Sequence, residues 1–223
     1  MESCVKLGEF DAVACMTTTT VIVGSYVGDK PNFVCLSSLQ LLFIFHFSSS
    51  SIQMTIAWCM PASNQPPAIV CACNKQHLTN SGIKEKKCFS VTIPSASHVA
   101  DVDLCGLKSG REMDKTTLWK VIKGPATGAP LLPDLGLTCE LSMMQTIDLP
   151  AHELFVGKIE GVYINKTALN SSGKPDLGLL APCLFSFLGS SGPGYFKLGG
   201  YIANAWQIGH TAEKKKEEFK VLP

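Results

Sequence analysis

The chain has 223 residues, which is enough for one large domain or two small ones with a sizeable core. Hydrophobic residues make up 46% of the sequence and charged residues 17%, a composition that is typical of a globular protein and excludes a largely disordered one. The 19 basic and 18 acidic residues leave a net charge of +1, so neither a nucleic acid nor an anionic membrane is expected as a partner.

Short β-branched segments dominate the first half of the chain. Turn-forming residues separate them, with a turn predicted at Gly28–Pro31 and a loop at Pro61–Pro67. Helices are predicted over Gln76–Lys87 and Ser97–Leu107, the second with Ser97 as its N-cap. The predicted strands are Thr17–Val27, Met54–Cys59, Ala68–Cys73 and Cys88–Pro94.

The second half contains two longer predicted strands, Leu137–Leu149 and Glu153–Ile164, joined by a turn at Pro150–His152. Many short strands with few short helices predict a mainly β fold, a closed or partly closed antiparallel barrel. A charged tail follows Gly209, and no internal repeat is visible.

Ten cysteines are spread along the chain without a C-x-x-C pair or histidines at zinc-finger spacing, so a structural zinc site is not expected. Residues Met1–Phe10 carry no export-signal pattern, which favours a cytoplasmic protein with reduced thiols. Most of the cysteines lie in apolar segments and are interpreted as small core residues.

One segment does not fit this pattern. No Asp, Glu, Lys or Arg occurs between Lys30 and Lys75, and that stretch contains Val34–Gln53, VCLSSLQLLFIFHFSSSSIQ. Its apolar part of about 14 residues is shorter than the roughly 20 that a membrane helix needs. The residues alone leave two interpretations open, an extra pair of strands or an exposed apolar loop.

Common catalytic signatures are absent from the sequence. There is no G-x-x-x-x-G-K-[ST] or G-x-G-x-x-G phosphate loop, no G-x-S-x-G nucleophile turn and no H-E-x-x-H zinc motif. Hydrolytic and metal chemistry therefore have no support, and we assign no catalytic side chain and no metal ligand.

Two polar clusters beside predicted strands are candidate binding residues. Asn74–Asn80 ends a strand and opens a helix, where free N–H groups and the helix dipole favour a phosphate; an ordinary capped helix is the alternative. Cys105–Lys115 contains two glycines, a serine and Arg111, the only arginine in the chain. Because a guanidinium matches phosphate or carboxylate, Arg111 favours a bound anion. Trp58 is interpreted as a core aromatic or as the wall of a site for a planar ring.

These clusters belong to five blocks that follow one another along the chain: Lys30–Phe33 (KPNF), Met54–Trp58 (MTIAW), Asn74–Asn80, Cys105–Lys115 and Leu149–Gly157. In order and spacing they resemble the flavin reductase-like, or flavoredoxin, family over roughly Thr17 to Gly209. The resemblance implies a split β-barrel that binds FMN, with antiparallel, Greek-key-like topology. It also implies a homodimer with the flavin near the subunit interface.

The resemblance assigns binding roles block by block, and the chemistry belongs to the cofactor and not to a side chain. The positions expected to line the flavin are Asn32, Thr55, Ala57 and Trp58, with His152 near the isoalloxazine side. The positions expected at the phosphate and ribityl chain are Lys75, His77, Thr79 and Asn80. The loop expected to close over the cofactor contributes Cys105, Gly106, Ser109, Gly110, Arg111 and Lys115.

The resemblance also suggests an origin for Val34–Gln53. In the family, KPNF continues directly into MTIAW, whereas here 20 residues intervene, and 223 − 20 leaves 203. A valine codon begins GU, a glutamine codon can be CAG, and FIFHFSSSS can be written almost wholly in pyrimidines. We interpret the segment as a translated, unspliced intron, with a true insertion at a hairpin tip as the alternative. The domains are then an N-terminal extension (1–16), a flavin reductase-like domain (17–209, interrupted at 34–53) and a charged tail (210–223).

The sequence therefore predicts an FMN-binding oxidoreductase, either an NAD(P)H:flavin reductase or a flavoredoxin-type electron-transfer protein. NADH or NADPH is the expected electron donor, and free flavin or a protein is the expected acceptor. One alternative is an electron-carrier or flavin-storage module without nicotinamide activity, and another is an inactive product if the insertion disrupts the FMN pocket. Cys105 is interpreted as a packing residue or as a redox-active thiol.

Overall fold

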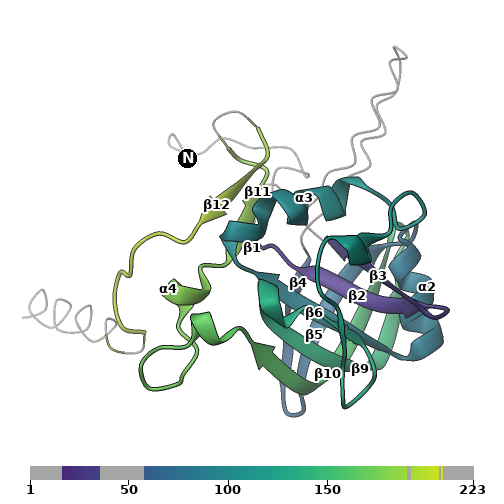
Figure 1. The fold of residues 1–223 in the computed structure, drawn as a ribbon, viewed down its shortest axis with the longest axis horizontal. Helices are drawn as coiled ribbons and strands as arrows, with labels where there is room; N and C mark the ends of the chain where they lie inside the picture. Colours follow the sequence, from purple (N-terminus) through teal and green to yellow (C-terminus); the bar gives the residue numbers. More distant parts are fainter. Residues whose placement is uncertain (1–16, 36–57, 190–191, 206, 208–223) are drawn as a thin grey trace, which may run out of the picture.

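Seven antiparallel strands form the main sheet of the computed structural model, which describes residues 17–35, 58–189, 192–205 and 207. Within these residues the strands lie in the order β3-β2-β6-β9-β10-β5-β4 (Figure 1). Their bounds are β2 (Ile22–Val27), β3 (Lys30–Cys35), β4 (Cys59–Asn64), β5 (Pro67–Asn74), β6 (Cys88–Pro94), β9 (Gly136–Asp148) and β10 (His152–Ile164).

Short helices and two small sheets surround the main sheet. Helix α2 (Leu78–Lys86) packs against β2, and helix α3 (Val99–Leu107) packs against β3 (Figure 1). The other elements are the sheet of β1 (Thr18–Thr19), β11 (Cys183–Ser186) and β12 (Gly194–Lys197), the pair β7 (Ile122–Lys123) and β8 (Pro130–Leu131), helix α4 (Leu177–Leu180), and the 3₁₀ turns η1 (Ala96–His98), η2 (Lys115–Thr117), η3 (Pro133–Leu135) and η4 (Lys166–Ala168).

The main sheet curls around one hydrophobic core. Strands from both ends of the sheet and from its centre contribute to that core, including Val34 on β3, Cys71 on β5 and Phe89 on β6. A Cβ added to Gly157 on β10 would lie 2.6 Å from the Phe89 ring, so this ring packs directly against the strand backbone. Because strands near both edges face the same interior, the fold is a split antiparallel barrel, which confirms the predicted mainly β class.

A second core lies beneath α3. Val102 and Cys105 of the helix pack there with Phe33 of β3 and with Leu132. Phe33 therefore belongs to this core whereas the next residue, Val34, belongs to the barrel core, as the alternation of side chains along a strand requires. The end of α3 is thereby held beside β3, at the point where the loop after α3 begins.

Several sequence predictions are confirmed by these elements. The helix predicted over Gln76–Lys87 is α2, the strand Cys88–Pro94 is β6, and the two long strands are β9 and β10. The loop predicted at Pro61–Pro67 is wrong, because 59–64 form β4 and only Gln65 and Pro66 separate it from β5. Pro61 fits a strand here because, among the described residues, β4 lies at the edge of the sheet and pairs only with β5.

The predicted boundaries differ in three further places. Ser97 is not a helix N-cap, because Ser95 accepts a hydrogen bond from the Ser97 N–H to begin η1, and α3 begins only at Val99. Thr17–Val27 is divided into β1, which pairs with β11, and β2, which pairs with β3 and β6. The turn expected at Gly28–Pro31 is reduced to its first two residues, with Gly28 at a φ of 58°.

Several predicted segments lie wholly or mostly outside the described residues. They are the extension (1–16), the insertion and the predicted strand Met54–Cys59, which are not described over residues 36–57, and the tail (210–223). The intron interpretation of Val34–Gln53 therefore stays a prediction. Its first two residues are described, since Val34 and Cys35 complete β3 and are buried. None of the helices in the described ranges is both long enough and apolar enough to cross a bilayer.

A buried carboxylate fixes the loop at 124–128 to the barrel. Glu140 on β9 accepts hydrogen bonds from the N–H groups of Ala126 (3.1 Å) and Thr127 (2.5 Å) and from the Thr127 hydroxyl (2.9 Å). The Tyr163 hydroxyl donates to its other oxygen at 3.0 Å. Burial opposes the ionisation of Glu140, but the hydrogen bonds from Thr127, Tyr163 and Ala126 outweigh it and lower the pKa.

Replacing Glu140 by Gln should destabilise the fold by about 1–3 kcal/mol, because the uncharged amide oxygen accepts weaker hydrogen bonds than the carboxylate and the NH₂ group faces the Tyr163 hydroxyl donor. The folded-state pKa lies below the ordinary value of 4.5, so the stability supplied by the carboxylate is complete above that value and is lost as pH falls through the folded pKa. Urea unfolding of both proteins should therefore show a difference at neutral pH that shrinks below pH 4.5.

Tyr163→Phe provides the matched control, since it removes one hydrogen bond and leaves the three bonds to Ala126 and Thr127 in place. Tyr163→Phe should lower the free energy of unfolding by less than Glu140→Gln does. A Glu140→Gln penalty that is unchanged between neutral and acidic pH would contradict the role of the ionised carboxylate.

Candidate functional site

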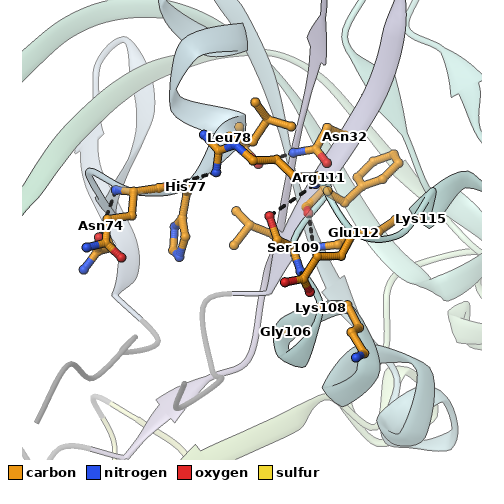
Figure 2. A pocket seen from close by; sticks show the side chains of 15 residues that line it. Asn32, Asn74, His77, Leu78, Gly106, Lys108, Ser109, Arg111, Glu112 and Lys115 are labelled. Atoms are coloured by element: carbon orange, nitrogen blue, oxygen red, sulfur yellow. Dashed lines mark hydrogen bonds between the residues drawn. The ribbon is translucent and has the colours of Figure 1, made fainter. Parts of the chain in front are cut away.

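A cavity of about 290 Å³ opens between β3, the segment that enters α2 and the loop that follows α3 (Figure 2). Three stretches that are distant in the sequence line it, residues 32–34, 74–79 and 106–115. Eight of the residues predicted from the sequence are brought together here: Asn32, His77, Thr79, Gly106, Ser109, Gly110, Arg111 and Lys115. The cavity thus combines side chains from three of the five sequence blocks.

The other predicted site residues do not line this cavity. Trp58 and His152 lie against each other, with ring centroids 4.9 Å apart and planes tilted by 39°. The predicted residues outside the cavity lining are Trp58, Lys75, Asn80, Cys105 and His152, while Thr55 and Ala57 lie outside the described residues.

Asn74 sets the path of the chain from β5 into α2. Its side-chain oxygen accepts a hydrogen bond from the Gln76 N–H at 3.0 Å, and its carbonyl oxygen accepts one from the His77 N–H at 3.0 Å. Asparagine suits such a turn because its short amide can mimic the backbone. His77 then occupies the N-cap of α2 without a side-chain capping bond, so no cap side chain competes with an anion at the first helical turn.

Asn32 connects β3 to both other walls of the cavity. Its Nδ2 donates to the Thr79 hydroxyl oxygen at 2.8 Å, and both residues are buried. Because the Thr79 oxygen accepts this bond, its hydroxyl hydrogen is left to donate to a ligand. Gly110 passes so close to Asn32 that a Cβ would lie 1.9 Å from Asn32 Oδ1, which explains a glycine at this point of the loop.

Ser109 organises the loop around Arg111. The Ser109 hydroxyl accepts a hydrogen bond from the Arg111 N–H at 3.2 Å, and the Ser109 carbonyl accepts bonds from the N–H groups of Glu112 and Met113, both at 3.0 Å. The exposed Arg111 side chain reaches across to the α2 entry segment, where its Nη1 donates to the Gln76 carbonyl oxygen at 3.2 Å (Figure 2). The guanidinium therefore bridges two walls of the cavity.

Lys115, at the end of the same loop, binds it to β3 and α3. Its Nζ donates to the carbonyl oxygens of Phe33 at 2.8 Å and Cys105 at 2.6 Å, and the residue is only 4% exposed. Burial lowers the pKa of this ammonium. Since Phe33 belongs to β3 and Cys105 to α3, Lys115 ties together the two elements that carry the walls of the cavity.

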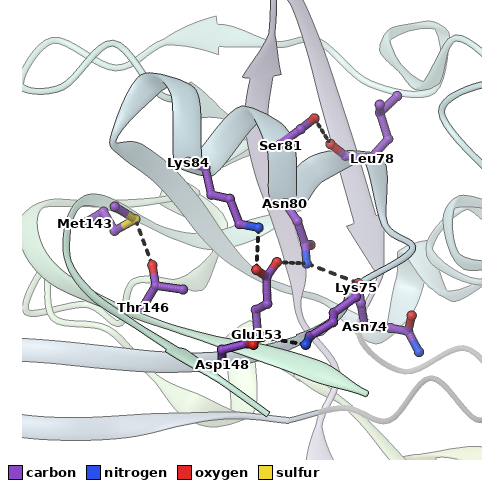
Figure 3. A network of polar contacts seen from close by, with 10 residues as sticks. All are labelled: Asn74, Lys75, Leu78, Asn80, Ser81, Lys84, Met143, Thr146, Asp148 and Glu153. Carbon is purple, nitrogen blue, oxygen red and sulfur yellow. Dashed lines mark hydrogen bonds and ion pairs between the residues drawn. The ribbon is translucent and has the colours of Figure 1, made fainter. Parts of the chain in front are cut away.

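A polar network anchors the other side of α2 (Figure 3). The buried Glu153 on β10 accepts a hydrogen bond from Asn80 Nδ2 at 3.0 Å and forms an ion pair with Lys84. Asn80 also donates to the Asn74 carbonyl at 3.1 Å, which joins the helix to the end of β5. Lys75, which the resemblance assigns to the phosphate, is paired here with Asp148 at 2.5 Å.

Three buried polar atoms near these walls have no hydrogen-bond partner among the described residues: His77 Nδ1, Asn80 Oδ1 and His152 Nε2. Burial, reinforced by Lys115 and His152, lowers the pKa of His77 to about 4. Burial also lowers the pKa of His152. His77 is therefore neutral near pH 7 and presents one ring nitrogen as a donor or acceptor to a bound molecule.

Cys105 supports the loop through packing. Its side chain is fully buried in the core beneath α3, and its carbonyl oxygen accepts the Lys115 hydrogen bond. Burial raises the pKa of the Cys105 thiol to about 11. A thiol that stays protonated near neutral pH is a poor nucleophile, which favours the packing interpretation over the redox one.

The cavity also contains residues that the sequence prediction omitted. Lys108 and Glu112 lie in the loop block, and Gln76 lies in the α2 entry block. Each lies between residues that the sequence prediction assigned to the site, so its position inside the block is the sequence signal that could have identified it. In the described ranges, no group of three or more His, Cys, Asp or Glu side chains is placed to hold a metal ion.

Comparisons with known proteins agree with this architecture. Residues 13–185 match the flavin reductase like domain family. The structure of flavoredoxin from Methanosarcina acetivorans is 27% identical, covers 94% of this chain and 99% of its own, and superposes with a TM-score of 0.78. An FMN-binding protein from Thermus thermophilus, 20% identical, shares the fold with a TM-score of 0.68 over 92% of this chain and all of its own.

A curated relative is the High molecular weight rubredoxin of Moorella thermoacetica, which is 34% identical over 101 residues. That match covers 44% of this chain and 43% of the relative, so the chain spans less than half the length of the relative. The family match, by contrast, extends over most of the chain and includes all three walls of the cavity. The protein therefore belongs to the flavin reductase like domain family, as its sequence blocks predict.

Proposed function

We propose that the protein is an FMN-dependent oxidoreductase that accepts electrons from NADH or NADPH and passes them to free flavin or to a protein acceptor. The observation that carries the proposal is the convergence of Arg111, Thr79 and Ser109 on one cavity at the start of α2. Guanidinium and hydroxyl donors beside a helix N-terminus suit a phosphate monoester. FMN carries one such group, and the sequence has no dinucleotide fingerprint.

The residues present fit this cofactor. Arg111 and Lys108 supply positive charge, and the Thr79 hydroxyl hydrogen is left to donate. The unpartnered Nδ1 of the neutral His77 adds a polar contact inside the same cavity. The titles of the similar structures are consistent with this assignment, since they name a flavoredoxin and an FMN-binding protein.

FMN, when bound, supplies two-electron and one-electron transfer chemistry that no amino-acid side chain provides. The protein's residues bind and orient the group. Arg111 would replace its bond to the Gln76 carbonyl by stronger, charge-assisted bonds to the phosphate. Trp58 and His152 would form an aromatic wall near the ring system, with His152 kept neutral by burial. Lys115 stays bonded to its two carbonyls and so keeps the loop in place.

A second candidate function uses the same cavity. An electron carrier or flavin-storage protein would need the same phosphate contacts but no binding of nicotinamide. The similarity to a flavoredoxin and to a High molecular weight rubredoxin favours keeping this alternative. Turnover with a nicotinamide donor separates the two functions.

The proposal includes a homodimer in the cytoplasm. Large apolar side chains are exposed on the described surface, among them Leu188 (61%), Tyr201 (78%) and Ile202 (95%). A second subunit that covered these side chains would remove their apolar surface from water. The eight described cysteines are free thiols, a state that a reducing compartment maintains.

The purified protein should release FMN and not FAD on heating, because the cavity offers one cluster of phosphate ligands. The FMN-loaded protein should then oxidise NADH or NADPH in steady state when free FMN is added. Chromatography of the released flavin and absorbance of the nicotinamide measure the two steps. Recovery of mainly FAD would overturn the cofactor assignment, and FMN recovery without nicotinamide oxidation would favour the carrier.

Arg111→Lys should weaken FMN binding by about 1–3 kcal/mol, since lysine keeps the charge but loses the two-pronged contact. Riboflavin, which has no phosphate, should bind both proteins almost equally. Fluorescence titration with both ligands measures the effect, and Lys120→Ala, an exposed residue outside the cavity lining, is the control. Equal weakening for FMN and riboflavin would mean that Arg111 supports the loop without contacting the phosphate.

Deleting Val34–Gln53, which joins Phe33 to Met54, should give a more soluble protein with higher FMN occupancy. The deletion continues β3 with Met54 and Thr55 opposite Val23 and Ile22, the register positions that Val34 and Cys35 now occupy. Flavin absorbance per chain and the soluble fraction measure the result, and the mature transcript should lack the corresponding 60 nucleotides. A deletion variant that loses flavin, together with a full-length transcript, would show that the segment is genuine protein.

A further inference from the structure

Two cysteines face each other across the hairpin of β4 and β5. The strand register places Cys59 directly opposite Cys71. The Cys71 thiol donates a hydrogen bond to the Cys59 sulfur, and the two sulfur atoms are 3.3 Å apart. Both residues are free thiols. The sulfur atoms are therefore already in contact but not bonded.

The backbone geometry of this pair matches that of a disulfide. The Ala72 N–H donates to the Trp58 carbonyl oxygen at 2.8 Å, so Trp58 and Ala72 are a hydrogen-bonded pair. The adjacent pair, Cys59 and Cys71, is then a non-hydrogen-bonded pair, in which Cα atoms lie about 4.5 Å apart. Disulfides occur at Cα separations of about 4.4–6.8 Å, so the strands need no rearrangement for the bond to form.

The two thiols differ in access to solvent. Cys59 is half-buried on the edge strand β4, whereas Cys71 is fully buried. The hydrogen bond to Cys59, together with burial, raises the pKa of the Cys71 thiol, which therefore retains its proton. An oxidant arriving from solvent meets Cys59 first, and Cys71 is the thiol within reach to complete the reaction.

We propose that Cys59 and Cys71 form a dithiol site that hydroperoxides oxidise to a reversible disulfide. The Cys59 sulfur attacks hydrogen peroxide, so that an S–O bond forms and the O–O bond breaks, and the released hydroxyl takes the Cys59 thiol proton and leaves as the first water. The Cys71 sulfur then displaces the hydroxyl from Cys59, and that hydroxyl leaves with the Cys71 proton as the second water. Two thiols lose two electrons in total, and one peroxide is reduced to two waters.

The dithiol site lies next to Trp58, which we propose to line the flavin together with His152. The oxidation of the two thiols does not require flavin. Cys59 follows Trp58, whose ring contacts His152. The disulfide joins the edge strand β4 covalently to β5 and so restrains the strand that begins next to Trp58. Cys73 and Cys139 belong to the same barrel core and are the competing partners that the experiment must distinguish.

The test treats the purified full-length protein with a small molar excess of hydrogen peroxide and blocks the remaining thiols with an alkylating agent. Digestion with pepsin at low pH prevents thiol exchange, and mass spectrometry identifies the linked peptides. The expected product is a Cys59–Cys71 linkage with loss of two titratable thiols per chain, and a thiol reductant should reverse both changes. The oxidised protein should also unfold at a higher temperature than the reduced one.

Three variants sharpen the result. Cys73→Ala should still form the Cys59–Cys71 linkage, whereas Cys59→Ala should form none. Cys71→Ala should leave Cys59 as a sulfenic acid that a dimedone probe captures. If Cys71→Ala does not fold, the wild-type linkage map decides. A linkage through Cys73 or Cys139, or peroxide treatment that leaves Cys59 and Cys71 unlinked, would overturn the proposal.

Discussion

The candidate site depends on a buried ammonium group. Lys115 is almost completely buried, and its Nζ reaches the carbonyl oxygens of Phe33 on β3 and Cys105 on α3. A buried charge without such partners would cost several kcal/mol, so the lysine holds the strand and the helix at one separation. The loop between Cys105 and Lys115 is thereby closed at both ends, and Arg111 lies within it.

The same arrangement explains how a small loop can be placed accurately against a barrel. Gly110 contacts Asn32, Asn32 donates to Thr79, and Thr79 lies in the first turn of α2. On the other side of α2, Glu153 accepts a hydrogen bond from Asn80 and forms an ion pair with Lys84. These two contacts fix the helix to β10. Two buried hydrogen bonds, from Asn32 to Thr79 and from Asn80 to Glu153, thus connect α2 to β3 and to β10. A ligand phosphate meets donors that are already positioned, which reduces the entropic cost of binding.

Much of the fold was predictable because the strands have clear local signals. The alternating segment Cys88–Pro94 and the long hairpin around Pro150 were recognised with nearly the observed bounds. Pro61 misled the prediction, because proline argues against a strand unless the strand lies at a sheet edge, and edge position is a property of the whole sheet. Ser95 and Ser97 are both good cap residues, and only the backbone geometry distinguishes them.

The site was predictable as blocks but not as individual contacts. The sequence blocks name residues that lie near one another, yet the strand register decides which of them face the cavity. The resemblance assigns Lys75 to the phosphate and Lys115 to the loop over the cofactor, but Lys75 pairs with Asp148 and Lys115 donates to backbone carbonyls. Lys108 was omitted although it lines the cavity, because its position inside the loop block does not distinguish it from the block's other exposed residues. These assignments depend on packing between segments that are far apart in the chain.

The central claim is that the cavity between β3, the entry to α2 and the loop after α3 holds the FMN phosphate. A crystal structure of the protein grown with FMN tests this most directly. We expect a phosphate within hydrogen-bonding distance of the Arg111 guanidinium and the Thr79 hydroxyl, with the Arg111 bond to the Gln76 carbonyl broken. A bound FMN whose phosphate lies outside this cavity would contradict the proposed binding site.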